Sequence, residues 1–166
     1  YAGNTEAIEE LLQVTKQLGG NVSSNMDACT KRCRAIVSEI YSPPSVTRAA
    51  ELLPQLNIDP GLAMDLTTTD EMGRPWDFSK EDMKAKARAK LRKQKPDLLV
   101  GNPMCTLYSA WQRLNKNKDI RAYRKRLKDA RDHMEFVCAL YLEQIRAGKL
   151  LLHEHPEGAS SWDEER

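Results

Sequence analysis

A cysteine stands where a strand is expected to enter a binding cleft. The segment Asp97-Leu-Leu-Val-Gly-Asn-Pro-Met-Cys105 is a short apolar run, bounded by charge, that ends in Gly and Pro. This pattern predicts a buried parallel strand followed by a tight loop. In open α/β sheets, ligands bind at the carboxyl ends of the strands. A thiol in this loop is therefore expected to face a cleft, as reactivity requires, although an inert buried cysteine is the alternative.

An acid follows the next apolar run. Lys149-Leu-Leu-Leu-His-Glu154 predicts a final buried strand. One crossover helix separates it from the cysteine strand, so the carboxyl ends of the two strands are expected at the same edge of the sheet. Cys105 and Glu154 should therefore face one cleft. A glutamate beside an apolar strand is costly unless it is paired, so a function or a salt bridge must explain it. The flanking His153 and His155 are expected to order the loop rather than to bind metal.

These two segments resemble the cytosine-C5 DNA methyltransferases. Gly-x-Pro-x-Cys-x-x-Tyr-Ser, residues 101–109, is similar to the family's nucleophile loop, Pro-Pro-Cys-Gln followed by an aromatic residue and Ser. The segment around Glu154 is similar to the family's Glu-Asn-Val. The resemblance covers residues 35–158. It implies a DNA-directed enzyme with S-adenosylmethionine as cofactor, Cys105 as nucleophile and Glu154 as the acid that contacts the target cytosine.

The implied reaction needs a thiol and a carboxyl group together. Carbon 5 of cytosine is a poor nucleophile until a thiolate adds at carbon 6. A carboxyl group that donates to ring nitrogen 3 stabilises the negative charge that then develops. Carbon 5 takes the methyl group of S-adenosylmethionine, and loss of its proton releases the thiolate. In duplex DNA the base must first be flipped out of the stack.

The resemblance also implies a cofactor cleft along the strand ends. Glu39-Ile-Tyr-Ser42 keeps the acidic-aromatic start of the family's first loop, but Pro43-Pro44 follows where the family has a glycine-rich turn. A rigid double proline cannot allow the same close backbone approach. Asp65 is expected to bind the ribose hydroxyls and Asp77 to lie near the adenine, although these two roles are interchangeable. The predicted cofactor-binding residues are Glu39, Ser42, Asp65, Asp77, Asn102 and Pro103.

Contacts with nucleic acid are predicted just past the cysteine loop, at Ser109, Trp111 and Arg113. Tyr108 and Trp111 can stack on a base or, equally, pack in the core. Two basic runs, residues 84–95 and 121–131, fall on predicted helices. Each is either a solvated helix face, the commoner case, or a surface that attracts phosphates. Both runs spread around their helices, so no single basic patch is predicted. The family's target-recognition region is not found in this chain.

The elements that hold these residues alternate between strand and helix. This pattern predicts an α/β, Rossmann-like methyltransferase fold, truncated, with a mostly parallel sheet and flanking helices. Pro60-Gly61 is expected to form the turn before the second strand. Ser45 and Ser79 are expected to cap the two shorter helices. Strands are predicted over 35–41, 62–66, 76–78, 98–100 and 149–154, and helices over 4–18, 46–53, 80–93 and 119–147.

Length and composition indicate about one globular domain. The 166 residues are 40% hydrophobic and 30% charged, with a net charge of only +2. We expect residues 1–34 to be a helical lead-in or linker, 35–158 the amino-terminal part of a methyltransferase-like catalytic domain, and 159–166 a tail that continues into a missing region. No apolar run approaches the roughly 20 residues that span a bilayer, and no signal peptide is found, so no membrane association is expected.

The cysteines favour a reducing, intracellular compartment, because four unevenly spread thiols are not a disulfide framework. Cys29 and Cys33 stand at helical spacing and could ligate a metal. A zinc site needs two more ligands, so two half-buried helix residues are the preferred interpretation and no metal is predicted.

Two other functions stay open. The first is a degenerate methyltransferase fold that binds nucleic acid or serves as a scaffold, which the missing glycines favour and the intact cysteine and glutamate oppose. The second is a Rossmann-like enzyme that acts on a small nucleotide at the same edge. Methyltransferase-like sequences with this loop also occur in mobile-element polyproteins, which is a further possible context. The sequence predicts no oligomeric state.

Overall fold

The structure, a computed structural model, describes residues 13–14, 16–17, 34–109 and 119–163. The chain divides into two compact units, Tyr1–Arg34 and Ala35–Arg166. In the first unit, residues 13–14 and 16–17 are helical and fall within the helix predicted over 4–18. The predicted site residues Trp111 and Arg113 lie outside the described residues, as do Cys29 and Cys33. The second unit carries the strands and the candidate site.

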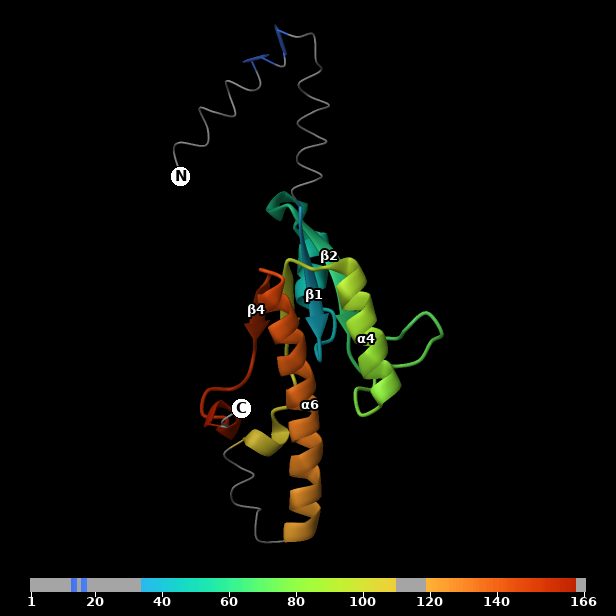
Figure 1. Cartoon of the computed structure of the whole chain (residues 1–166), viewed down its shortest axis with the longest axis vertical. Coiled ribbons are helices and arrows are strands. Elements are labelled where there is room, and N and C mark those ends of the chain that lie inside the picture. Colours follow the sequence, from blue (N-terminus) through green and yellow to red (C-terminus); the bar gives the residue numbers. More distant parts are fainter. Residues whose placement is uncertain (1–12, 15, 18–33, 110–118, 164–166) are drawn as a thin grey trace. The chain divides into compact units, whose positions relative to one another are not determined.

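A four-stranded parallel sheet forms the centre of the second unit, with the strand order β2-β1-β3-β4 (Figure 1). β1 pairs with β2 and β3, and β3 pairs with β4, all in parallel. This confirms the predicted α/β arrangement with a parallel sheet. The strands are β1 (Ala35–Ile40), β2 (Ile58–Met64), β3 (Leu98–Gly101) and β4 (Leu150–His153).

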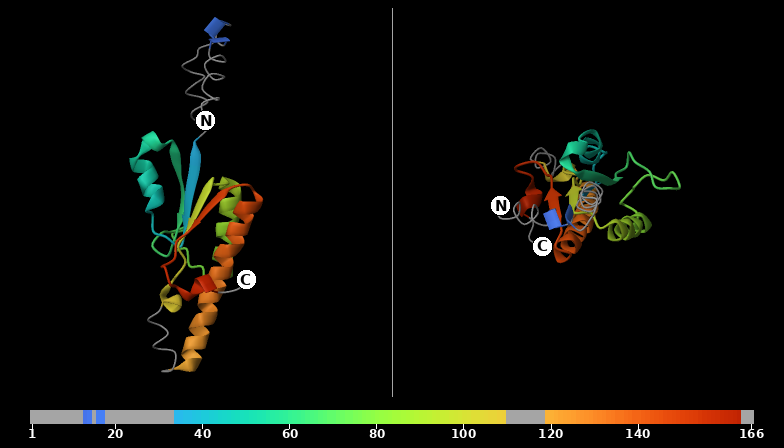
Figure 2. Two further views of the ribbon diagram at one scale, coloured as in Figure 1. Left: turned by 90° about the vertical axis from the view of Figure 1, so that its left-hand side faces the viewer. Right: turned by 90° about the horizontal axis from the view of Figure 1, so that it is seen from above.

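Helices cover both faces of the sheet (Figure 2). On one face, Ala50 of α3 (Val46–Leu52) packs against Val37 and Val100. The larger core lies on the other face, beneath α4 (Glu81–Gln94) and α6 (Ile120–Arg146). The long helix predicted over 119–147 is confirmed to within one residue at each end. Its apolar residues recur every three to four positions, so one side of it is buried along the sheet.

β2 begins earlier than predicted, and Pro60-Gly61 lies inside the strand instead of forming a turn. A proline is tolerated there because β2 is an edge strand, where its missing N–H is not needed. The register with β1 shifts between Val37 and Glu39, and the Leu62 N–H donates to Ser38 Oγ at 3.1 Å. A Cβ on Gly61 would stand 2.3 Å from that same Ser38 oxygen. The glycine therefore serves a close backbone approach within the strand.

The predicted strand over 76–78 is wrong. An isolated antiparallel bridge joins Thr69 to Pro75, and the chain then runs on without pairing. Trp76 and Phe78 are both buried in the main core, and the Phe78 ring centroid lies 4.8 Å from that of Tyr41. The apolar alternation that predicted a strand instead reflects two aromatic side chains that enter the core without a neighbouring strand.

Neither predicted serine cap makes the expected hydrogen bond. Ser45 occupies the N-cap position of α3, but its side chain caps no N–H group of that helix. Ser79 stands one residue too early, because α4 begins at Glu81 with Lys80 as its N-cap. The Ser79 hydroxyl donates to Asp77 Oδ1 at 2.6 Å instead. The hydrogen bond to a charged carboxylate is a strong one and fixes the Ser79 side chain on Asp77. Among the described residues, no helix is long and apolar enough to cross a membrane.

Candidate functional site

The carboxyl ends of β3 and β4 lie side by side. Gly101 pairs with His153 in the parallel register, and the Glu154 N–H donates to the Gly101 carbonyl at 2.9 Å. The predicted adjacency of the two strands is confirmed. The loop that carries Cys105 and the segment that carries Glu154 therefore leave the sheet from neighbouring strands at one edge.

His155 joins these two segments beyond the end of the sheet. Its Nε2 lies 3.2 Å from the Pro103 carbonyl oxygen, which can only accept, so Nε2 carries the proton. Nδ1 then accepts from the Ser161 hydroxyl at 2.5 Å. Burial of the ring lowers the pKa of His155, although the Pro103 carbonyl and Glu154 partly oppose this shift. A neutral imidazole thus holds the cysteine loop in place, which confirms the loop-ordering interpretation of His155.

The cysteine loop has a fixed backbone and a reachable thiol. The Asn102 N–H donates to the Ile40 carbonyl at 3.1 Å, which ties the loop to β1. The Cys105 carbonyl accepts from the Tyr108 N–H at 2.9 Å, at the start of the short 3-10 helix Thr106–Tyr108. Cys105 itself is a half-buried free thiol, and Glu154 is exposed. Both predicted catalytic side chains are thus accessible from solvent.

Two aromatic residues lie near this edge, of which the sequence analysis selected only Tyr108; the other is Trp162. Tyr108 is buried with its ring centroid 5.8 Å from that of His155, so it packs in the core and is not free to stack on a base. The Ser109 hydroxyl donates to the Thr106 carbonyl at 3.0 Å. Trp162 was not predicted, yet its ring is 55% exposed and lies 5.3 Å from the ring of His153. It was missed because it stands in a charged segment that reads as a tail.

Gly101 allows α6 to contact the strand ends directly. A Cβ on Gly101 would stand 2.0 Å from the Tyr141 hydroxyl. That hydroxyl lies 3.0 Å from His153 Nδ1, and burial raises the pKa of Tyr141, so it stays protonated. A side chain larger than hydrogen at position 101 would push α6 away from the edge that holds the cysteine loop.

Glu39 is a buried carboxylate that accepts hydrogen bonds from the loop after β1. Its side chain is fully buried, with 0% exposure. Oε1 accepts from the N–H and hydroxyl of Thr47, both at 2.7 Å, and from the Ser45 N–H at 3.0 Å. Oε2 accepts from the hydroxyls of Ser42 and Ser45 at 3.0 and 2.8 Å. The carboxylate therefore supplies the cap of α3 that the Ser45 side chain was expected to supply.

These hydrogen bonds keep Glu39 ionised although it is buried. Burial alone would raise its pKa, but the donors from Thr47 and Ser45 outweigh that effect and lower the pKa to about 2. Both oxygens are engaged by the chain itself in this conformation. Ser42 is also buried and donates to the same carboxylate. The two residues thus build the loop, and a direct contact of either with a cofactor stays a prediction.

A cavity of about 220 Å³ opens beside the strand ends and brings together both predicted nucleoside-binding acids. Asp65 Oδ1 accepts from the N–H and hydroxyl of Thr67 at 2.9 and 2.8 Å. Asp77 Oδ1 accepts from Ser79, and this bond, opposed by burial, lowers the pKa of Asp77. The cavity is lined by Tyr41, Asp65, Leu66, Trp76, Asp77, Phe78, Ser79, Met104 and His133.

Tyr41 and His133 form one wall of this cavity, and sequence reasoning selected neither. Tyr41 has a φ of 61°, a left-handed conformation that is strained for a bulky residue. Its hydroxyl lies 2.9 Å from Nδ1 of His133 on α6. Burial lowers the pKa of His133, and Lys84 adds to this effect. The backbone thus turns at Tyr41 where a glycine would be expected, and the aromatic core holds it there. The aromatic in Glu-Ile-Tyr was the only available signal.

A second buried carboxylate orders the loop between β2 and α4. Asp70 Oδ1 accepts from the N–H groups of Met72 and Arg74, and Oδ2 is paired with Arg74 and with Lys86 of α4. The Lys86 ammonium is the main reason why the pKa of Asp70 lies far below its usual range. This residue was missed, although Asp-x-x-Gly at 70–73 is a recognisable turn pattern.

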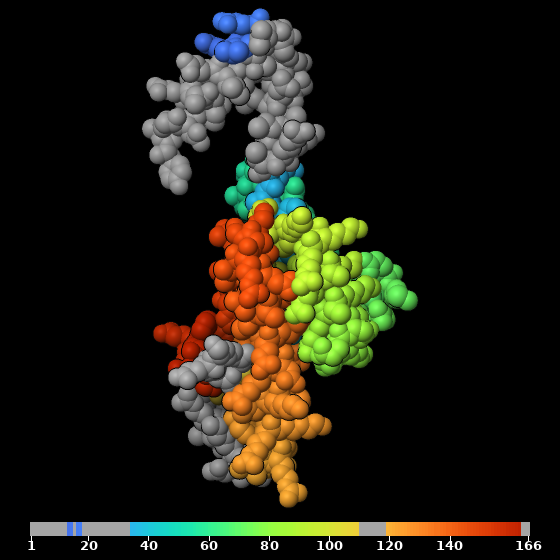
Figure 3. Space-filling model, viewed as in Figure 1, coloured from blue at the N-terminus to red at the C-terminus, as the bar shows by residue number. Residues whose placement is uncertain are grey.

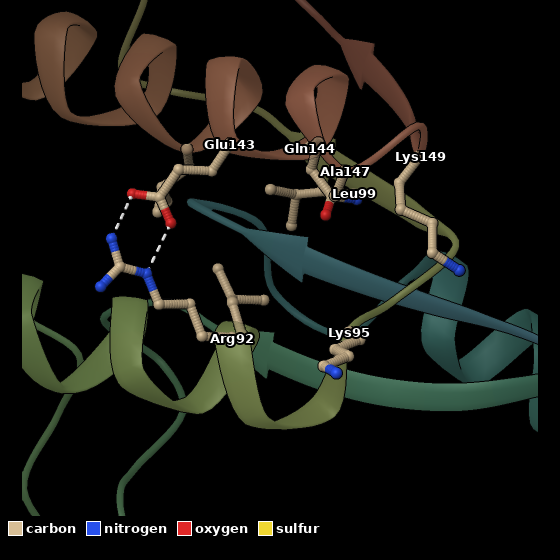
Figure 4. Close-up of a pocket in the computed structure, with 9 residues that line it drawn as sticks. Arg92, Lys95, Leu99, Glu143, Gln144, Ala147 and Lys149 are labelled. Atoms are coloured by element: carbon tan, nitrogen blue, oxygen red, sulfur yellow. Dashed lines mark hydrogen bonds and ion pairs between the residues drawn. The ribbon is translucent and has the colours of Figure 1, made fainter.

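Another cavity, of about 370 Å³, lies at the opposite edge, where the strands begin. Leu91, Leu99 and Leu140 form its buried floor. Arg92 crosses from α4 to pair with Glu143 of α6 at its mouth, and Lys95 and Lys149 lie on its other side (Figure 4). It is larger than the cavity beside Asp65 but contains no candidate catalytic residue.

Within the described part of the chain, no group of three or more His, Cys, Asp or Glu side chains is arranged to hold a metal ion. Comparison with protein-family models, with curated proteins and with solved structures finds no match for this chain. We therefore base the functional assignment on the geometry of the strand-end edge and on the sequence resemblance.

Proposed function

We propose that this chain carries the catalytic part of an S-adenosylmethionine-dependent cytosine-C5 DNA methyltransferase with a Rossmann-like fold. One observation carries the proposal: parallel neighbours β3 and β4 deliver Cys105 and Glu154 to the same edge, and His155 fastens the two segments together through Pro103. A thiol and a carboxyl group that must act on opposite sides of one ring, at carbon 6 and nitrogen 3, need such a common, fixed support.

The cavity beside Asp65 and Asp77 supports a nucleoside-binding role. Its lining combines aromatic and aliphatic side chains with two carboxylates, the mixture that small-molecule sites use to enclose an apolar ring and orient its polar groups. Asp65 Oδ1 is engaged by Thr67, so Oδ2 is the oxygen that would accept from the ribose hydroxyls. At about 220 Å³ the cavity is below the roughly 300–1,000 Å³ usual for whole ligands. It therefore fits the nucleoside portion rather than the entire cofactor.

Each residue then has a defined chemical task. The Cys105 thiolate forms a bond to carbon 6 of cytosine as the C5=C6 double bond opens. The Glu154 carboxyl group donates a hydrogen bond to nitrogen 3, where the electron pair accumulates. S-adenosylmethionine, when bound, supplies the methyl group and leaves as the neutral thioether. Loss of the carbon 5 proton to a base restores the double bond, and the carbon–sulfur bond breaks to release Cys105.

A specific observation favours a second candidate, a degenerate module that binds nucleic acid without catalysis. The loop after β1 contains Pro43-Pro44 and no glycine, and Glu39 is sealed within it by its own loop. If the methionine portion of the cofactor needs a close backbone approach there, this loop opposes it. The intact, accessible Cys105 and Glu154 oppose the degenerate alternative.

Covalent capture distinguishes the two candidates. DNA that contains 5-fluorocytosine is incubated with the chain and S-adenosylmethionine, and adducts are resolved on a denaturing gel. Fluorine on carbon 5 cannot leave as the proton does, so the bond between Cys105 Sγ and carbon 6 persists. We expect an adduct with the wild-type chain and none with Cys105→Ser.

Cys138→Ser is the matched control, because Cys138 is also a half-buried thiol but lies on α6. It should form the adduct at the wild-type level. Binding of the DNA by a folded wild-type chain with no adduct would support the degenerate module instead.

A further inference from the structure

The two basic runs of this chain differ in how the fold uses them. On α4, all the cations at positions 84, 86, 88, 90 and 92 form ion pairs. Lys86 pairs with buried Asp70 at 2.7 Å, and Lys90 pairs with Glu71. Arg88 and Arg92 both pair with Glu143, at 3.1 and 2.8 Å. The positive charge of this run therefore serves mainly to join α4 to its neighbours.

Five cations of the run on α6 differ from those of α4. Within the described residues, no ion pair is found for Arg121, Arg124, Lys125, Arg126 or Lys128, and all of these residues are exposed. Asp119, just before the helix, accepts from the backbone N–H groups of Arg121 and Ala122 as its cap, and the next acids along α6 are Asp129 and Asp132. Four of the cations follow each other at spacings of three and four residues, so they share one side of the helix. They are Arg121, Arg124, Lys125 and Lys128, and we call them the α6 basic stripe.

The stripe is not scattered as the sequence suggested. Tyr123, Leu127 and Ala130 form the opposite side of the same turns, which faces the domain, with Leu127 against the main core and Ala130 buried. Arg126 lies off the stripe, and Arg131, the last member of the run, is not counted in it. The charged and the apolar residues of α6 therefore lie on different sides of the helix. The sequence did not reveal this because basic residues occur at most positions of the run.

The stripe also extends beyond the sheet. α6 has 27 residues, a length of roughly 40 Å, whereas β3 and β4 have only four residues each. No residue of α6 before Ala130 is buried. α6 returns the chain from the end of β3 to the start of β4, so its first turns lie at the edge where the strands end. Figures 1 and 3 show this part of α6, in orange, projecting past the strand ends.

We propose that the α6 basic stripe binds the phosphate backbone of DNA next to the Cys105 edge. The stripe runs from Arg121 to Lys128, about 10 Å along the helix, which matches about three phosphates of one strand at 3.4 Å of rise each. It makes contact without reading sequence, because phosphate contacts position a protein and base contacts specify. The proposal takes the identity of its partner from the proposed function.

The chemistry of the stripe favours DNA over an anionic membrane surface. A helix that lies in a bilayer interface needs an exposed apolar side opposite its charged side. On α6 the opposite side carries Tyr123 and Leu127, both partly buried, with Leu127 packed against the main core, so it offers no continuous exposed apolar surface. A row of cations on a projecting helix, without an apolar side to insert, suits a polyanion that lies along its surface.

Salt-dependent binding tests the stripe. Fluorescence anisotropy of a labelled duplex measures the observed binding constant as salt is raised. A plot of log K against log salt has a negative slope, and each phosphate that the protein no longer neutralises makes that slope shallower by about 0.9. We expect the triple variant Arg121→Gln, Arg124→Gln and Lys125→Gln to have a slope that is smaller in magnitude by about three. At low salt it should bind the duplex at least tenfold more weakly than the wild type.

A matched control removes three exposed cations from the opposite edge, by Lys93→Gln, Lys95→Asn and Arg146→Gln. Net charge changes equally, and asparagine suits the left-handed backbone at position 95. This control should keep the wild-type slope. Equal losses in both sets, no change in the stripe variant, or tighter binding of phosphatidylserine vesicles than of duplex would each overturn the proposal.

Capture of 5-fluorocytosine DNA by the same variants separates this inference from the proposed function. A slope that falls only in the stripe variant, without any adduct in the wild-type chain, would leave the stripe standing and reject the methyltransferase reaction. An adduct with an unchanged slope in the stripe variant would reject the stripe alone.

Discussion

Two loops leave the same edge of the sheet, and the fold treats them in opposite ways. The loop after β1 is organised from within by Glu39, a fully buried carboxylate that accepts hydrogen bonds from Ser42, Ser45 and Thr47. The loop after β3 is held from outside, by the Ile40 carbonyl and by His155. Its candidate nucleophile, Cys105, stays half-exposed.

The difference separates a structural acid from a candidate chemical group. Glu39 is the residue whose position most resembles a cofactor-binding acid, yet its hydrogen bonds are satisfied within the protein. Cys105 and Glu154 are held by backbone contacts and by a neighbouring histidine, so their side chains remain available. This distinction predicts that removing Glu39 lowers the free energy of unfolding. Removing Cys105 or Glu154 should instead leave stability unchanged and abolish the proposed reaction.

The largest effect on stability is expected for Glu39→Ala. The substitution removes the acceptor of the Ser45 N–H and leaves the buried Thr47 N–H without one, and an unsatisfied buried donor costs about 1–3 kcal/mol. The shift of the Glu39 pKa from 4.5 to about 2 independently corresponds to about 3 kcal/mol. Urea unfolding at neutral pH should therefore give a free energy of unfolding about 3 kcal/mol below that of the wild type.

Glu51→Ala, at an exposed position of α3, is the matched control and should stay within about 0.5 kcal/mol of the wild type.

The pH dependence of stability gives a second test of Glu39. Because the folded-state pKa is depressed, the contribution of Glu39 is present above pH 4.5 and is lost as pH falls toward 2. A Glu39→Ala variant as stable as the wild type at neutral pH would mean that the loop after β1 does not depend on this carboxylate.

An intermediate effect is expected from His155. Burial lowers the pKa values of His133, His153 and His155 below the ordinary 6.5. The unfolded chain therefore binds protons before the folded chain does, so stability is highest above pH 6.5 and falls as the solution is acidified below it. His155→Gln should lose about 1–2 kcal/mol at neutral pH and show a shallower decline in acid, as measured by urea unfolding at a series of pH values.

Ser161→Ala tests whether the imidazole itself is responsible. This variant removes the partner of Nδ1 but keeps the titrating ring, so it should lose about 1 kcal/mol while retaining the wild-type decline in acid. If His155→Gln and the wild type lose stability identically as the pH falls, protonation of His155 is not the cause of the decline in acid.

The smallest effects on stability are expected for Cys105→Ser and Glu154→Gln. Cys105 is half-exposed and Glu154 is exposed, so each variant should stay within about 0.5 kcal/mol of the wild type in urea. Each should nevertheless strongly reduce capture of 5-fluorocytosine DNA. A large loss of stability in either variant would place that residue with Glu39 among the structural groups and would remove it from the candidate site.

Much of the fold follows from sequence pattern. Apolar runs bounded by Gly and Pro predicted β1, β3 and β4, and the repeat of apolar residues along 119–147 predicted α6, because these signals are local and repeat over several turns. The start of β2 could not be predicted, since Pro60-Gly61 indicates a turn unless the strand lies at the sheet edge. The false strand at 76–78 arose because alternation records which side chains are buried and not which backbone is paired.

By itself, the sequence determined the strand-helix alternation and the positions of Cys105 and Glu154 at strand ends, because strand ends follow from local hydrophobicity and from Gly and Pro. Only the tertiary structure decided which charged groups are already engaged. Glu39 and Asp70 are satisfied by partners that the folded chain brings to them, and four cations of α4 are neutralised by acids from other elements: Lys86, Arg88, Lys90 and Arg92. Charge is local in the sequence, but its neutralisation depends on contacts between distant segments, which exist only once the chain has folded.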